Sequence, residues 1–298
     1  MNIVIIGQGA IGLLWYHHLA KISTNAVSLA CSSRTKAIPS HYRFTDLDKQ
    51  SALLPLTAAN NTTFAEAELI LVCVKSYQVS AAVQAFNNKI TSEAVIVFCH
   101  NGMGAFDDIS SLSQAACALL TTHGCKINRP FHAQHTGTGH NDLGLISGSV
   151  AASVRDNIAA TLTQALPTLA LTDNIKAKQW LKLAINCVIN PLTAIDNIDN
   201  GQLLNDKYQQ IVTALINEVI AVARLEGIKF EAKSLEAKVW QVATDTASNC
   251  SSMRSDILRQ RKTEINYING YLVNLAKKHG ILVPENEKLL QQIKALEP

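Results

Sequence analysis

The sequence has little charge and no long hydrophobic run. Only 16% of its 298 residues are charged, and the formal net charge is +3. Such a weak balance argues against a nucleic-acid-binding surface, so we expect no nucleic-acid partner. No apolar run approaches the roughly 18 residues of a membrane-spanning helix, so we expect no membrane segment. The start, MNIVIIGQGA, lacks the basic stretch of a signal peptide, and we predict a first strand and a cytoplasmic protein.

Cysteine motifs typical of metal sites are missing as well. The seven cysteines, at positions 31, 73, 99, 117, 125, 187 and 250, form no CxxC motif, and their number is odd. Most of them stand in apolar runs such as LVCVK and INCVI. This pattern is typical of buried free thiols in a reducing compartment, so we predict neither disulfides nor a metal site.

The first half of the sequence alternates short apolar runs with helical stretches. Candidate strands lie at 2–6, 27–30, 69–74, 94–99 and 116–121, with helical stretches at 10–21 and 76–87. Several runs are apolar throughout, as in parallel strands that are covered on both faces. The alternation predicts a doubly wound α/β sheet. The segment 131–153, rich in glycine and threonine, is expected to add antiparallel strands to this domain.

The second half lacks strand-like runs, and helical periodicity continues to its end. We therefore place a domain boundary near residue 172, with an α/β domain over 1–172 and an all-α domain over 173–298. A last helix is predicted over 264–279. Thr263 is its expected N-cap, Gly280 its stop, and Pro284 lies beyond it.

A glycine motif directly follows the first predicted strand and precedes a helical run. Its six residues are Gly7, Gln8, Gly9, Ala10, Ile11 and Gly12. In this position GxGxxG is the fingerprint of a dinucleotide-binding loop, where the helix N-terminus offers N–H groups to a pyrophosphate. We therefore predict cofactor binding here, with a turn that binds no ligand as the alternative.

The expected acidic residue after the second strand is absent. An NAD site usually has Asp or Glu about 20 residues beyond the loop, but here the first acid is Asp46, and Ser32, Arg34 and Lys36 come before it. Hydroxyls and cations suit a 2′-phosphate, which favours NADP over NAD. Lys75, which follows the strand 69–74, is a second candidate for contact with the adenosine phosphate. The alternative is a solvated surface lysine.

A polar stripe interrupts the apolar segment KLAINCVINPL. Lys182, Asn186 and Asn190 stand four residues apart, and steps of four residues drift by only about 40° around a helix. They therefore share one narrow edge of a helix that is otherwise suited to burial, and Pro191 should end or kink that helix near Asn190. One interpretation is a lysine that reaches solvent beside two capped asparagines. The functional interpretation is a stripe that lines a cleft between the domains and faces a nicotinamide.

A second polar group lies further along the chain. Asn249, Ser251 and Ser252 precede the helical run SMRSDILRQR, and the hydroxyl of Ser252 is suited to bind a carboxylate. Glu264 lies 12 residues after Ser252, so the two would not share a face of one continuous helix. The hydrophilic segment 259–263 predicts a break between them. His100 and His123 are interpreted as structural residues.

These motifs together resemble the ketopantoate reductase family. GQGAIG, VKSYQV, HNGMG, KLAINCVINPLTAI, NCSSM, TEINYING and HGILVPEN occur in the family's order over nearly the whole chain. The long middle block is highly specific, whereas GxGxxG alone is not. The resemblance implies an α/β Rossmann-type N-terminal domain that binds NADP(H), an all-α C-terminal domain that binds substrate, and reduction of ketopantoate to pantoate on the route to pantothenate and coenzyme A.

The resemblance also implies roles for individual residues. Lys182 would be the proton donor, and Glu264 the acid beside the reacting hydroxyl and the nicotinamide. Substrate contacts would come from Asn101, Asn186, Asn190, Asn200, Asn249 and Ser252. Cofactor contacts would come from the glycine loop, Ser32, Arg34, Lys75, Asn101, Cys125 and Glu264. Family members often have an arginine directly after the second strand, where this sequence has Ser32 and Ser33 before Arg34, so the 2′-phosphate ligand stays open among Ser32, Arg34 and Lys36.

Three other functions remain open at this point. One is an NADP-linked dehydrogenase of another 2-keto or 3-hydroxy acid, because substrate choice lies in the helical domain. Another is a non-catalytic NADP-sensing protein, which would not need the lysine, asparagine, serine and glutamate set. A Schiff-base lysine is the third, although that chemistry would not need the dinucleotide loop. We expect a monomer or homodimer.

Overall fold

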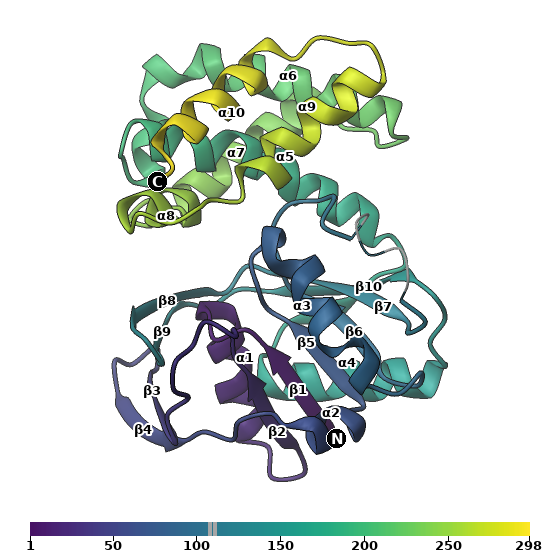
Figure 1. The fold of residues 1–298 in the computed structure, drawn as a ribbon. Helices are drawn as coiled ribbons and strands as arrows, with labels where there is room; N and C mark the ends of the chain where they lie inside the picture. The colour runs from purple at the N-terminus through teal and green to yellow at the C-terminus, as the bar shows by residue number, and fades with distance from the viewer. Residues whose placement is uncertain (107–108, 110–111) are drawn as a thin grey trace. The chain divides into compact units, whose positions relative to one another are not determined.

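The structure of the chain, a computed structural model, describes residues 1–106, 109 and 112–298. It divides into two compact units (Figure 1). Met1–His100 and Phe106–Lys176 form the first unit, and Asn101–Ala105 and Ala177–Pro298 form the second. The short segment 101–105 thus packs with the helical unit, although the sequence analysis had placed it in the N-terminal domain.

The first unit is built on a seven-stranded sheet with the strand order β11-β10-β7-β6-β5-β1-β2. Its strands are β1 (Asn2–Ile6), β2 (Ala26–Ala30), β5 (Leu69–Val72), β6 (Val95–Phe98), β7 (Ala116–Thr121), β10 (Asn141–Ser147) and β11 (Leu169–Leu171). Its helices are α1 (Ala10–Ala20), α2 (Asn61–Ala65), α3 (Val79–Phe86) and α4 (Ala152–Ala165), with short 3-10 turns η1 (Ser76–Gln78) and η2 (Asn87–Lys89). The five predicted strands are confirmed within two residues at each end.

The order of the sheet places the glycine loop at a reversal of the winding. β1 pairs in parallel with β2 on one side and with β5 on the other, so the chain winds outward from β1 in both directions. The crevice at such a switch point is where doubly wound sheets bind ligands. Ile3 and Ile5 of β1 share one buried cluster with Leu13 of α1 and Leu162 of α4, which anchors the strand that leads into the loop.

A second, four-stranded sheet was not predicted from the sequence. Its order is β4-β3-β9-β8, with β3 (His41–Thr45), β4 (Ser51–Pro55), β8 (Gly124–Arg129) and β9 (His132–Gly137). The expected antiparallel strands in 131–153 are present as β9 and β10, but they belong to different sheets. β4 and β8 are largely exposed or half-buried, so they lack the continuous apolar runs that revealed the parallel strands.

Histidines on α1 join the helix to this second sheet. The His17 ring stacks on Phe44 with 3.6 Å between ring centroids, and its Nδ1 lies 3.0 Å from the Tyr42 hydroxyl. His123 Nδ1 lies 3.3 Å from His135 Nε2, which is consistent with the structural role predicted for His123. Burial, with a smaller contribution from Lys21 and the neighbouring histidines, lowers the pKa of His17 from 6.5 to about 3.

The second unit is helical. Its elements are α5 (Ile175–Ile195), η3 (Asn200–Leu204), η4 (Asp206–Tyr208), α6 (Gln209–Leu225), α7 (Ala232–Asp245), α8 (Ser252–Leu258), η5 (Ile265–Tyr267), α9 (Asn269–Lys278) and α10 (Pro284–Leu296). The side chains of Leu183 and Cys187 on α5 lie in one core with Leu215 of α6, Val239 of α7 and Leu272 of α9. α5 therefore contributes to the centre of this unit's core.

The helix predictions for this unit hold only in part. Of the end or kink predicted near Asn190, the end is wrong, because α5 runs through Pro191 to Ile195. The predicted helix 264–279 is divided into η5 and α9 at Ile268, which has φ −110° and ψ −96°. Gly280 does stop α9, with φ +68°. Pro284 then begins a further helix, α10, where its fixed φ favours the first helical position.

All seven cysteines are free thiols, and four of them are buried, whereas Cys250 is exposed. Within residues 1–106, 109 and 112–298, no three side chains of the metal-ligand types are grouped to hold a metal ion. Over the same residues, no helix has both the length and the apolar character that a bilayer crossing requires.

The histidine cluster predicts a loss of stability in acid. Burial also lowers the pKa of His18, to about 4, so the folded chain keeps these rings neutral while an unfolded chain protonates them below 6.5. Because the unfolded state then binds more protons, stability should be fully present above pH 6.5 and fall as pH decreases towards 4. Urea unfolding at several pH values measures this. His17→Phe should give a shallower pH dependence, and an unchanged slope would contradict the assignment.

Candidate functional site

The glycine loop in the first unit has the backbone geometry that a phosphate requires. Gly7 has φ +108° and donates its N–H to Ala30 O at 2.9 Å. A Cβ on Gly12 would overlap the carbonyl oxygen of Gly7, so only glycine lets α1 start this close to the strand. A Cβ on Gly9 would meet protein only at 3.9 Å, from Cys73 O. Gly9 is exposed, and its open side is where a phosphate can approach the backbone.

Gln8 ties this loop to the segment after β2. Its Nε2 donates to Thr35 Oγ1 at 2.7 Å, and its Oε1 accepts from the Ser32 N–H at 3.0 Å. The Arg34 N–H donates to Ser32 Oγ at 3.3 Å, so Ser32 through Thr35 form a compact turn with an exposed Arg34 side chain. The sequence analysis placed Gln8 in the loop but missed this bridge and Thr35.

The remaining cofactor candidates of this unit occupy two different places. Lys75 is the N-cap of η1, three residues after the end of β5, and its N–H donates to Gln78 Oε1 at 3.1 Å. It lies two residues after Cys73, whose N–H donates to Ile6 O at 2.8 Å, so it shares the carboxyl edge of the sheet with the glycine loop. Cys125 lies on β8 of the other sheet, and burial raises the pKa of its thiol to about 12.

In the helical unit, α5 carries the predicted stripe on three consecutive turns. Asn190 is buried, whereas Lys182 and Asn186 are half-buried. The stripe therefore lies on one edge of a helix whose other positions, such as Leu183 and Cys187, are in the core.

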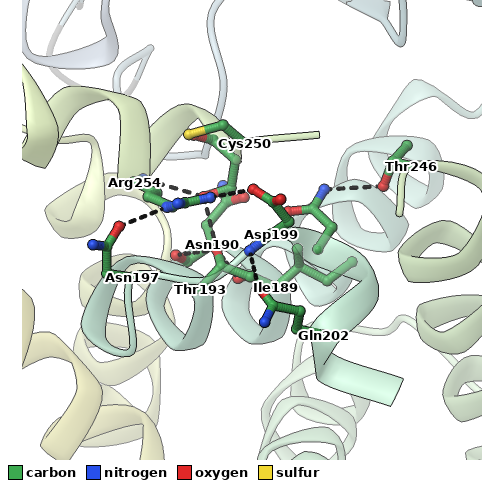
Figure 2. A network of polar contacts seen from close by, with 11 residues as sticks. Ile189, Asn190, Thr193, Asn197, Asp199, Gln202, Thr246, Cys250 and Arg254 are labelled. Carbon is green, nitrogen blue, oxygen red and sulfur yellow. Dashed lines mark hydrogen bonds and ion pairs between the residues drawn. The ribbon is translucent and has the colours of Figure 1, made fainter. Parts of the chain in front are cut away.

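A network of hydrogen bonds connects the carboxyl end of this stripe to the start of α8 (Figure 2). Thr193 Oγ1 lies 2.7 Å from Ile189 O, 3.2 Å from Asn190 O and 2.8 Å from Ser251 Oγ. Ser251 Oγ also caps α8 by accepting the Arg254 N–H at 3.1 Å. Ser252, the exposed first residue of α8, is thereby held at a fixed place relative to α5.

The same network holds Asn200 and Asn249. The Asn200 N–H donates to Asn249 O at 3.1 Å, and Asn200 Nδ2 donates to Thr246 Oγ1 at 2.9 Å. Thr246 Oγ1 donates in turn to Val242 O at 2.6 Å, which fixes it as the acceptor for Asn200. Asn200 Oδ1 is buried and has no hydrogen-bond partner among the described residues, so it is an acceptor suited to a ligand.

Arg254 belongs to the same hydrogen-bond network, and the sequence analysis missed it. Its Nε donates to Asn197 Oδ1 at 2.8 Å, and its Nη1 forms an ion pair with Asp199, next to Asn200 (Figure 2). The arginine thus holds the segment after α5 against α8. No spacing rule pairs these residues, because they come from two segments that only the fold brings together.

Backbone contacts join the residues after Asn101 to the turn that follows Glu264. Glu264 is buried, follows the predicted break after α8, and accepts the Tyr267 N–H through its carbonyl at 2.9 Å. The Met103 N–H donates to Tyr267 O at 2.8 Å. Gly102, with φ +79°, lies so close to Tyr267 O that a Cβ would overlap it. Gly102 and Met103 therefore lie against the backbone of η5, directly beyond Glu264.

Thr263 anchors this turn and is not the cap of a long helix. Its N–H and its hydroxyl donate to Glu297 Oε1 at 2.7 and 2.6 Å, and its Oγ1 accepts the Ile265 N–H at 3.1 Å. The helical unit therefore contains Asn101, Lys182, Asn186, Asn190, Asn200, Asn249, Ser252 and Glu264, and the first unit contains the glycine loop, Ser32, Arg34, Lys75 and Cys125.

Comparisons with known proteins match both units. A family model described as ketopantoate reductase PanE/ApbA matches residues 3–148, and one described as ketopantoate reductase PanE/ApbA C terminal matches residues 174–297. The chain is 39% identical to 2-dehydropantoate 2-reductase of Vibrio cholerae, with 100% of this chain and 98% of that protein covered.

Solved structures agree. A PanE/ApbA family ketopantoate reductase from Ralstonia eutropha JMP134 is similar with a TM-score of 0.88 and 26% identity, covering 99% of this chain and 98% of that one. A ternary structure of D-mandelate dehydrogenase with NADH and anilino(oxo)acetate reaches a TM-score of 0.90 at 22% identity, with 99% and 98% covered. At that identity the likeness to D-mandelate dehydrogenase shows the fold alone.

The two glycines of the loop should respond differently to alanine. In Gly9→Ala the new methyl group fits the protein but occupies the approach of a phosphate, so we expect an unchanged melting temperature and a loss of dinucleotide affinity of about 10-fold or more. In Gly12→Ala the methyl group overlaps Gly7, so folding itself should be impaired. Thermal melts and dinucleotide titration of both variants test this. Normal dinucleotide affinity in Gly9→Ala would contradict it.

Proposed function

Because the chain belongs to the ketopantoate reductase family, we propose that it reduces 2-dehydropantoate (ketopantoate) to (R)-pantoate with NADPH, as a step of pantothenate and coenzyme A biosynthesis. The observation that carries the proposal is the network of the helical unit. Thr193 bonds the Asn190 carbonyl and Ser251, which precedes Ser252, and Asn200 bonds the Asn249 carbonyl. Arg254 joins the two groups through Ser251 and through Asp199, which precedes Asn200. A small acid with hydroxyl groups suits this set of amides and hydroxyls.

The cofactor is NADP(H), which ketopantoate reductases use. The glycine loop would hold the pyrophosphate, with Gly9 at the point of closest approach. Ser32, Arg34 and Lys36 remain the candidates for the 2′-phosphate, and Lys75 for a further phosphate contact. The exposed Arg34 in the turn fixed by Gln8 is the strongest of these, since a guanidinium can bind phosphate bidentately. Asn101, Cys125 and Glu264 are proposed as further cofactor contacts.

The reaction needs one hydride and one proton at the keto group. When bound by the first unit, NADPH would supply the hydride to C2 of the keto acid. Lys182 gives a proton to the oxygen that becomes the new hydroxyl, so the keto acid gains two hydrogens in total. Glu264 is proposed to lie beside that oxygen and the lysine. Protonation by a positioned acid contributes about 10² to 10⁴ in rate.

The rest of the site orients the substrate. Asn186 and Asn190 are proposed to bind its hydroxyl group, and Ser252 its carboxylate. Asn200 presents a buried oxygen that lacks a partner among the described residues, so a hydroxyl group of the substrate can donate to it. Asn249 and Asn101 complete the polar contacts. We propose that the enzyme works in the cytoplasm as a monomer or homodimer.

Turnover assays decide between this function and its rivals. The purified protein is mixed with ketopantoate and NADPH, then with NADH, and cofactor oxidation is followed by absorbance. 2-Ketoisovalerate is the matched control, because it lacks the hydroxymethyl group that the asparagines are proposed to hold. We expect fast oxidation only with ketopantoate and NADPH. Equal rates with both acids would indicate a dehydrogenase with broad specificity for 2-keto acids. NADPH binding without any oxidation would indicate a sensor.

Replacing the proposed proton donor should remove turnover but not cofactor binding. We expect Lys182→Ala to lower kcat by about 10² to 10⁴, because the general acid is lost. NADPH affinity should stay within about twofold, because Lys182 is proposed to act on the substrate oxygen and not to bind the cofactor. Lys178→Ala is the matched control, an exposed lysine one turn earlier on α5. An unchanged kcat in Lys182→Ala would remove this lysine from the mechanism.

A further inference from the structure

Pro191 leaves one carbonyl of α5 without its usual helical donor. In an α-helix the N–H of residue 191 would donate to the carbonyl of Cys187, four residues earlier, but proline has no N–H. α5 nevertheless continues to Ile195, and the Cys187 side chain is fully buried. A buried carbonyl without a donor is strongly unfavourable, so another group must supply the hydrogen bond.

Asn269 supplies it. Asn269 is the first residue of α9 and is fully buried. Its Nδ2 donates to Cys187 O at 3.0 Å. The bond therefore replaces, from another helix, the rung of the α5 ladder that Pro191 removes. Cys187 and Pro191 belong to the same turn as Asn186 and Asn190, the two asparagines proposed to hold the substrate.

Two further residues, Asn286 and Glu218, fix the direction of this amide. Glu218 of α6 accepts the N–H groups of Glu285 and Asn286 at 2.8 and 2.9 Å and Asn286 Nδ2 at 2.7 Å. A carboxylate only accepts, so Asn286 turns its Oδ1 to Asn269, at 2.9 Å. Asn269 must then present its NH₂ group to both Asn286 Oδ1 and Cys187 O.

The oxygen of the Asn269 amide, Oδ1, is buried and makes no hydrogen bond to the described residues. An apolar residue at this position would avoid that penalty, so the value of asparagine lies in its donor. This donor bonds the Cys187 carbonyl of α5, next to Asn186, one of the asparagines proposed to bind the substrate.

We propose that Asn269 is a positioning residue, which holds the turn of α5 around Pro191 so that Asn186 and Asn190 face the keto acid. The inference rests on the proposed function. Without the donor, the buried Cys187 carbonyl lacks a hydrogen bond, and α5 bends at Pro191 to reach another donor, which rotates the two asparagines away from the substrate. Asn269 itself does not touch the substrate or the cofactor.

The test compares Asn269→Leu with Pro191→Ala and the double variant. Leucine is similar in size but cannot donate, so we expect kcat/KM for ketopantoate to fall about 10- to 100-fold, as small misplacements do. KM for NADPH should change less than about twofold, because the effect is confined to substrate binding. Alanine at 191 returns the backbone N–H to the Cys187 carbonyl, so the double variant should recover most of the activity.

Leu272→Ala is the control for a loss of stability alone. Leu272 is fully buried on the same helix, α9, and its removal should lower the melting temperature without a selective rise in KM for ketopantoate. A folded Asn269→Leu variant with unchanged kinetics would overturn the proposal. The proposal would also be overturned if Asn269→Leu lowered activity by the same factor in the wild-type background and in the Pro191→Ala background.

Amide hydrogen exchange separates this inference from the proposed function. Exchange of residues 187–195 should be faster in Asn269→Leu and return towards the wild-type rate in the double variant, with or without substrate. If the wild-type protein fails to reduce ketopantoate, the proposed function fails and the substrate part of the inference fails with it. Unchanged exchange in Asn269→Leu, in a wild type that is active, overturns the inference alone.

Discussion

The helical unit depends on satisfying the backbone of α5 across Pro191. α5 carries core residues on most sides, so it cannot expose an unpaired carbonyl to water without leaving the core. The donor comes from Asn269 of α9, which is oriented by Asn286 of α10 and by Glu218 of α6. Four helices are therefore joined by one directed chain of hydrogen bonds, and the residues proposed to bind the substrate lie beside it.

Side-chain hydrogen bonds also fix the carboxyl end of α5. There Thr193 reaches back to the carbonyls of its own helix and across to Ser251, and Arg254 holds the following segment through Asn197 and Asp199. These contacts use side chains that are not proposed to touch the substrate. The proposed substrate groups are thus supported by neighbours whose own conformations are fixed, which is what a precise binding geometry requires.

In the first unit, one helix connects the cofactor loop to a second sheet. α1 starts directly after Gly9 and carries His17 and His18 near its other end, where they pack against Phe44 and His135. Burial lowers the pKa of both α1 histidines, so the helix is held by neutral rings near neutral pH. Gln8 adds a second support by connecting the loop to the turn that presents Arg34. Both supports act through elements that the glycine motif alone does not reveal.

The sequence by itself determined the parallel strands, the glycine loop, the change to helices and the edge shared by Lys182, Asn186 and Asn190, because these depend on local periodicity and spacing. Tertiary structure decided the rest. Pro191 predicted an end or a kink, but α5 continues to Ile195, and Asn269, 78 positions later in the chain than Pro191, donates to the Cys187 carbonyl. The four-stranded sheet has half-exposed strands without an apolar run. Arg254, Thr35 and Thr193 gain their roles from partners in separate segments, and no local pattern encodes such contacts.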